Sequence, residues 1–176
     1  MVALTVYPNG GSWNNSSANQ SFSQAPSTTK TISDPSRTGY NFTGWTPGGG
    51  GSLNGTTYTF GSSNGTLTAQ WSKNSYTLTT QASPSDAGTI TDGGSVGYGD
   101  QVELTATPAS TSGYTIAFSS WGLSGTGNLS SVNTNPTTYT MGAGDATVTG
   151  YFTSSANTYY VKFNGNGATG GGMSDQ

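Results

Sequence analysis

The sequence contains two versions of one pattern, Gly39-Tyr40-Asn41-Phe42-Thr43-Gly44-Trp45 and Gly113-Tyr114-Thr115-Ile116-Ala117-Phe118-Ser119-Ser120-Trp121. Each version begins with Gly-Tyr, alternates its side chains and ends at Trp. Two later motifs also return in the same order, Thr56-Thr57-Tyr58-Thr59-Phe60 as Thr137-Thr138-Tyr139-Thr140-Met141 and Leu67-Thr68-Ala69-Gln70-Trp71 as Val148-Thr149-Gly150-Tyr151-Phe152. Three motifs that recur in one order indicate tandem modules.

The segments between and within these motifs predict β-strands. Apolar and β-branched residues alternate along them with period two, and glycine-containing turn signals separate them. These turn signals are Asn9-Gly10-Gly11, Asn54-Gly55, Asn64-Gly65, Asp92-Gly93-Gly94 and Gly99-Asp100. The sequence therefore predicts a mainly β protein of small tandem modules, the second an antiparallel meander or sandwich.

Two local exceptions to the strand pattern are expected in the first module. Ser33 or Asp34 could cap a helix with Pro35 in its first turn, so Ser33–Arg37 is the one candidate for a short helix of a turn or two. The run Gly48–Gly51 has no side chain to pack and a high entropy cost of ordering, which predicts a mobile loop.

The repeats give the domain boundaries. We expect a first module at residues 1–71, a linker at 72–75, a second module at 76–152 and a linker at 153–158. Residues 159–176 resemble the opening strand and turn of a third, truncated repeat, so we expect the chain to be a piece of a longer protein. Short linkers predict an elongated arrangement of modules.

Composition and charge narrow the classes of function. Only 6% of the residues are charged, the net charge is −3, and the four cations are scattered, which makes nucleic acid a poor candidate partner. The chain has no Cys and no His, so disulfides, thiolate metal sites and the commonest proton shuttle are excluded. No signal peptide and no run of about 18 apolar residues is present, so we expect no direct membrane insertion.

The motifs resemble a known family. The motif aromatic-x-Asn-Gly-Gly at Val6–Gly11 is followed by Asp34-Pro35-Ser36-Arg37 and Gly39–Trp45, and then by Tyr58, Phe60 and Leu67–Trp71. This series is similar to the internalin-type B repeat, also called the Listeria-Bacteroides repeat, of bacterial cell-surface proteins. The second module is similar to the divergent form of that repeat and lacks the Asp-Pro-x-Arg turn. The resemblance implies a ubiquitin-like β-grasp for the first module, a surface-adhesion or spacer context, and no catalytic residue.

Large aromatic residues are the candidate structural and binding residues. Those that recur at matching strand positions are expected in the cores: Trp45, Tyr58, Trp71, Trp121, Tyr139 and Phe152. Trp13 lies in a polar loop with no counterpart in the second module, so we expect an exposed ring there that could contact a ligand. The acidic residues lack the regular ligand spacing that calcium needs, and the sequence predicts no metal ion and no cofactor.

These observations predict a non-catalytic, extracellular module of a bacterial surface protein that serves adhesion or spacing. The expected partners are neighbouring repeats of the same protein and an unidentified host or bacterial surface ligand, with a glycan as one candidate. The alternative is a carbohydrate-binding module that uses exposed aromatic rings.

Overall fold

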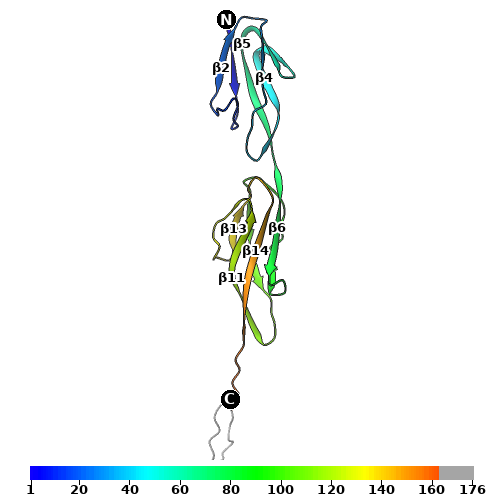
Figure 1. Cartoon of the computed structure of the whole chain (residues 1–176), viewed down its shortest axis with the longest axis vertical. Coiled ribbons are helices and arrows are strands. Elements are labelled where there is room, and N and C mark those ends of the chain that lie inside the picture. Colours follow the sequence, from blue (N-terminus) through cyan, green and yellow to red (C-terminus); the bar gives the residue numbers. More distant parts are fainter. Residues whose placement is uncertain (163–176) are drawn as a thin grey trace, which may run out of the picture.

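The computed structural model describes residues 1–162, which form an all-β protein. Figure 1 shows two modules placed end to end, and the chain passes from the first to the second through β5 (Thr57–Lys73) and β6 (Ser75–Ser83). The prediction of tandem, mainly β modules is confirmed. Within residues 1–162 there is no helix with the length and apolar character needed to cross a membrane.

The first module is a mixed sheet centred on β1 (Val2–Tyr7) and β5. These two strands run parallel, with Val6 opposite Leu67, and β2 (Gln20–Gln24) is antiparallel to β1. Both β4 (Tyr40–Asn54) and the short β3 (Thr29–Thr31) are antiparallel to β5. The finer assignment to a β-grasp fold stays a prediction.

The second module repeats the same central arrangement. Its first strand, β6, runs parallel to its last strand, β14 (Ala146–Ala156), with Thr80 opposite Val148. On either side lie β8 (Gly94–Gly97) and β11 (Tyr114–Gly125), both antiparallel. The main sheet of this module is therefore mixed, and not purely antiparallel as the sequence predicts. Smaller sheets complete the module: β9 (Gln101–Leu104) with β13 (Thr137–Thr140) and β12 (Asn128–Leu129), and β7 (Gly88–Ile90) with β10 (Ala106–Pro108).

Each module has a hydrophobic core of its own. Alternate residues of a strand point to one face of the sheet, so the period-two pattern places the apolar side chains together. The buried cluster of the first module comprises Leu4, Val6, Trp13, Ile32, Tyr58, Phe60 and Leu67. That of the second comprises Leu78, Ala87, Leu104, Ala106, Trp121, Leu129, Tyr139, Met141, Ala146, Val148 and Phe152.

The helix expected at Ser33–Arg37 does not form, and no residue from 1 to 162 is helical. The backbone N–H of Ser36 donates to the carbonyl of Ser12 at 2.9 Å, and the N–H of Ser12 donates to the carbonyl of Ser36 at 2.7 Å. Pro35 is buried. Backbone groups that pair with a distant segment are not free for the local hydrogen bonds of a helix.

The mobile loop expected at Gly48–Gly51 is also wrong, because all four glycines lie inside β4, and Gly48, Gly49 and Gly51 pair with β5. Gly49 has φ +74°, and the register of the ladder shifts between Gly49 and Gly51. A Cβ atom on Gly51 would meet the hydroxyl group of Tyr58. The glycines therefore allow a bulged, close approach of two strands.

The boundaries between modules differ from the expected linkers. Strand β5 continues to Lys73 and β6 begins at Ser75, so Asn74 alone separates the two strands. The expected linker at 153–158 is largely strand, because β14 extends to Ala156 and pairs with β11. Of the expected third repeat, residues 159–162 form no strand, and residues 163–176 lie outside the described part of the chain.

Candidate functional site

The structure places five of the six recurrent aromatic residues in or against the two cores, and Trp71 at the edge of the first module. Tyr58, Trp121, Tyr139 and Phe152 are buried. Trp45 is half-buried and packs against the core of the first module. Trp71 is also half-buried; its ring contacts Phe42, and its indole N–H donates to the carbonyl of Pro8 at 3.2 Å.

Trp13 is not the exposed ring that the polar loop suggested, because only 2% of its surface is accessible. Its indole N–H donates to the carbonyl of Ser33 at 2.8 Å, and the ring packs edge-on against Phe22 and Trp45. The loop turns inward at Asn14 and Asn15, both with positive φ. A buried indole cannot offer its face to a sugar, so Trp13 is a core residue.

Residues 1–162 contain no side-chain cluster that could hold a metal ion. No group of three or more His, Cys, Asp or Glu side chains comes together there. The feature that brings functional groups together is instead the joint between the modules, formed by residues 37–40, 73–74 and 98–100.

The backbone of Asn74 holds this joint from both sides. Its N–H donates to the carbonyl of Gly39 in the first module at 2.9 Å, and its carbonyl accepts from the N–H of Tyr98 in the second module at 2.8 Å. Its side-chain amide donates to the hydroxyl of Tyr76 at 3.3 Å. One residue therefore ties the end of one sheet to a turn of the next module.

Side chains close the joint around Asn74. The rings of Tyr40 and Tyr98 meet edge to face with centroids 6.0 Å apart, and Tyr98 also covers Gly39, where any Cβ would clash with the ring. Arg37 stacks on the ring of Tyr40, with its guanidinium carbon 3.8 Å from the centroid of that ring. Such aromatic and cation–π contacts each contribute about 0.5–1.5 kcal/mol.

An ion pair adds a polar contact at the edge of the joint. Lys73 Nζ lies 2.6 Å from Asp100 Oδ1, and both side chains are partly exposed. The hydrogen bond to Asp100 raises the pKa of Lys73 above its ordinary value. Exposed pairs of this kind contribute little to stability but favour one relative orientation of the two modules.

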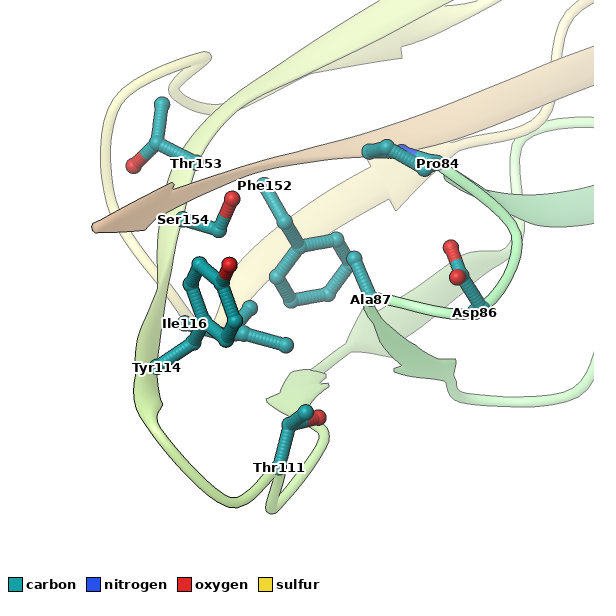
Figure 2. Close-up of a pocket in the computed structure, with 9 residues that line it drawn as sticks. All are labelled: Pro84, Asp86, Ala87, Thr111, Tyr114, Ile116, Phe152, Thr153 and Ser154. Atoms are coloured by element: carbon teal, nitrogen blue, oxygen red, sulfur yellow. The ribbon is translucent and has the colours of Figure 1, made fainter. Parts of the chain in front are cut away.

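Two cavities lie at corresponding ends of the modules. One, of about 510 Å³, is lined at the joint by Gly10, Arg37, Tyr40 and Tyr98, among others. The other, of about 290 Å³, lies at the far end of the second module. Figure 2 shows its Phe152 ring in the middle, with Tyr114 and Ile116 on one side and Ala87 on the other.

Sequence reasoning missed the joint residues Asn74, Tyr98 and Asp100. The pair Gly99-Asp100 predicts only a turn, and Gly99 does have positive φ. One signal was present: Asn74 stands two residues before Tyr76, and Asn157 stands two residues before Tyr159. An Asn-x-Tyr motif at each module boundary could have marked the joint.

Comparison with known proteins identifies the modules. The model of one family, described as the divergent InlB B-repeat domain, matches residues 2–75 and again residues 76–156. No curated protein and no solved structure matches the chain. InlB-type B repeats occur in bacterial surface proteins. The chain therefore belongs to the divergent InlB B-repeat family, with one repeat in each module.

Proposed function

We propose that this chain is a non-catalytic, extracellular spacer within a bacterial surface protein, a stiff stalk that holds an adhesive region away from the cell. The joint between the modules carries this proposal. A flexible tether would let neighbouring modules reorient and fold back, whereas a spacer must keep its length.

Several features of the joint favour stiffness. A single residue, Asn74, separates β5 from β6, and its backbone is hydrogen-bonded to both modules. The contact between Tyr40 and Tyr98 and the pair Lys73–Asp100 resist rotation about that residue. Figure 1 shows the resulting end-to-end arrangement. The family, whose repeats occur in bacterial surface proteins, supports the extracellular location.

Distances between spin labels on the two modules test the stiffness. The chain has no Cys, so Ser23→Cys in β2 and Thr89→Cys in β7, both exposed, give one label in each module. Pulsed electron spin resonance should give a single narrow distance distribution. Tyr98→Ala should broaden it, because the ring that packs on Gly39 and Tyr40 is lost.

Tyr151→Ala is the matched control, since Tyr151 is an exposed tyrosine of the second module that takes no part in the joint. It should leave the distribution narrow. A broad distribution in the unaltered chain would overturn the spacer function. The location is tested separately, since antibodies against this chain should label intact cells that produce the parent protein.

Carbohydrate binding remains the alternative function, supported only by exposed tyrosines. Trp13, whose polar loop predicts an exposed ring for such binding, is buried. Tyr114 is 53% exposed and lies beside the smaller cavity. Binding of the whole chain on a glycan array, lost on Tyr114→Ala, would favour this function over the spacer.

A further inference from the structure

One of the two backbone hydrogen bonds that Asn74 makes at the joint recurs at the far end of the second module. The N–H of Asn157 donates to the carbonyl of Gly113 at 2.9 Å, as the N–H of Asn74 donates to the carbonyl of Gly39 at 2.9 Å. Gly113 has φ +81° and Gly39 has φ +75°. In both places a strand begins at the Tyr of a Gly-Tyr pair, and the carbonyl of the Gly accepts a hydrogen bond from the Asn at the end of the module.

The side chains repeat as well. The amide of Asn157 donates to the hydroxyl of Tyr159 at 3.3 Å, the same contact and distance as in the pair Asn74–Tyr76. In sequence, Asn157-Thr158-Tyr159-Tyr160-Val161 follows the pattern of Asn74-Ser75-Tyr76-Thr77-Leu78, with Asn, Tyr and an aliphatic residue at matching positions. The end of the second module is thus built as a module boundary.

The partner ring is missing at this second boundary. Tyr98 covers Gly39 and Tyr40 at the joint, whereas no residue from 1 to 162 takes that place over Gly113 and Tyr114. Tyr114 is 53% exposed and Tyr159 is 73% exposed. Tyr114 also lines the smaller cavity, as Figure 2 shows, and an exposed aromatic ring at the rim of a cavity is typical of an interaction surface.

We propose that Gly113, Tyr114 and Asn157, here called the distal joint surface, dock a further B-repeat module that follows in tandem, in which Tyr159 takes the position of Tyr76. That module supplies a ring at the position of Tyr98 and a backbone N–H to the carbonyl of Asn157. The proposal rests on the spacer function, because the stalk would be lengthened by adding modules through the same type of joint.

The second joint differs from the first in two respects. The ladder of β11 and β14 continues four residue pairs beyond Phe118–Phe152, to Tyr114–Ala156, while that of β4 and β5 continues two beyond Phe42–Trp71. This places the distal joint surface farther from its core.

The second boundary also has uncharged residues at the positions of Lys73 and Arg37. Ala156 stands at the ladder position of Lys73, and Thr111 accepts from the N–H of Tyr114 as Arg37 does from that of Tyr40. The second joint therefore relies on hydrogen bonds and ring contacts, without an ion pair. Its geometry should be less sensitive to salt than that of the first joint.

A chain with three modules tests the proposal. Residues 1–157 are kept and a second copy of residues 75–156 is joined after Asn157, so that Asn157 takes the place of Asn74. Spin labels at Thr89 and at the matching threonine of the added copy report on the second joint, and labels at Ser23 and Thr89 report on the first. We expect a narrow distance distribution at both joints.

Variants separate the possible outcomes. Tyr114→Ala should abolish the narrow distribution at the second joint only, and the control Tyr151→Ala should leave both joints narrow. A broad second distribution beside a narrow first one would overturn the docking proposal alone, whereas two broad distributions would overturn the spacer function as well. Denaturation of the 176-residue chain should show unchanged stability for Tyr114→Ala, since its ring is exposed.

Other occupants of the surface would also be detected. Self-association of the 176-residue chain in sedimentation, abolished by Tyr114→Ala, would assign the surface to a second copy of the chain and overturn the proposal. Glycan binding abolished by the same substitution would overturn it in favour of a carbohydrate site.

Discussion

Tyr58 and Tyr139 occupy the same position in the two modules but differ in what their hydroxyl groups contact. Both side chains are buried, with 1% and 0% of their surface accessible. The hydroxyl of Tyr139 donates to the carbonyl of Thr126 at 2.7 Å. Among residues 1–162, that of Tyr58 has no hydrogen-bond partner. A buried polar atom without a partner costs about 1–3 kcal/mol, so the two hydroxyls have opposite effects on stability.

Substitution by phenylalanine should separate the two tyrosines. Tyr139→Phe should lower the free energy of unfolding of the second module by about 1 kcal/mol, because a hydrogen bond is lost. Tyr58→Phe should leave the first module unchanged or stabilise it by about 1 kcal/mol. Urea denaturation measures both, and an equal loss in the two variants would mean that the Tyr58 hydroxyl has a partner such as a bound water.

The same burial predicts a loss of stability at alkaline pH. Desolvation raises the pKa of Tyr58 and of Tyr139 above 10.0, and for Tyr139 a hydrogen bond with the backbone of Gly142 opposes the shift only in part. A raised pKa means that the folded state holds the phenol proton more tightly than the unfolded state does. The contribution of this proton to the free energy of unfolding is therefore complete below pH 10 and is lost as pH rises through the folded-state pKa. The fall of unfolding free energy above pH 10 should be shallower in the double variant Tyr58→Phe/Tyr139→Phe, as measured by denaturation at a series of pH values.

Single residues were predictable from sequence where they recur. Tyr58 and Tyr139 were expected in the cores because they stand at matching positions, and both are buried there. Trp13 has no counterpart in the second module, and its polar neighbours predicted an exposed side chain where the structure has a buried one. Its burial depends on positive φ at Asn14 and Asn15 and on a hydrogen bond to the distant Ser33, neither of which has a periodic signal.

At the scale of elements, glycine decides how β4 and β5 pair. The run Gly48–Gly51 predicted a loop because glycine lacks packing side chains, but in a paired strand that absence lets another group come close. Gly51 lies against the hydroxyl of Tyr58. For Ser33–Arg37, a local capping signal was overridden by pairing with Ser12. Both errors have one cause, namely that partners distant in sequence determine the element.

Gly51→Ala should therefore destabilise the first module. The added methyl group would push the Tyr58 ring out of its place in the core, and overpacking of this kind costs about 1–3 kcal/mol. Ser52→Ala, an exposed change at the next residue of β4, is the control and should have little effect. Combining Gly51→Ala with Tyr58→Phe should recover part of the loss in denaturation experiments, and no recovery would show that the hydroxyl is not the obstacle.

At the scale of the molecule, the repeats predicted modules with separate interiors, and the buried residues do form two clusters. The Asn-x-Tyr motif marks the position of the joint in the sequence, but the contacts among Gly39, Asn74 and Tyr98 were beyond prediction, because these residues are far apart in the chain and follow no common period. Once the joint is known, its repetition at Gly113 and Asn157 can be recognised.

Separate cores predict separate losses of stability. Trp121 is 3% exposed and its indole N–H donates to the carbonyl of Thr134 at 2.8 Å, so Trp121→Ala should cost the second module about 3–5 kcal/mol. Trp13→Ala should do the same in the first module, whose core is distinct. Hydrogen exchange resolved by peptide, followed through a urea series, measures each module by itself. An equal loss in both modules from either substitution would mean that the joint couples their unfolding, and the stalk would then behave as one cooperative unit.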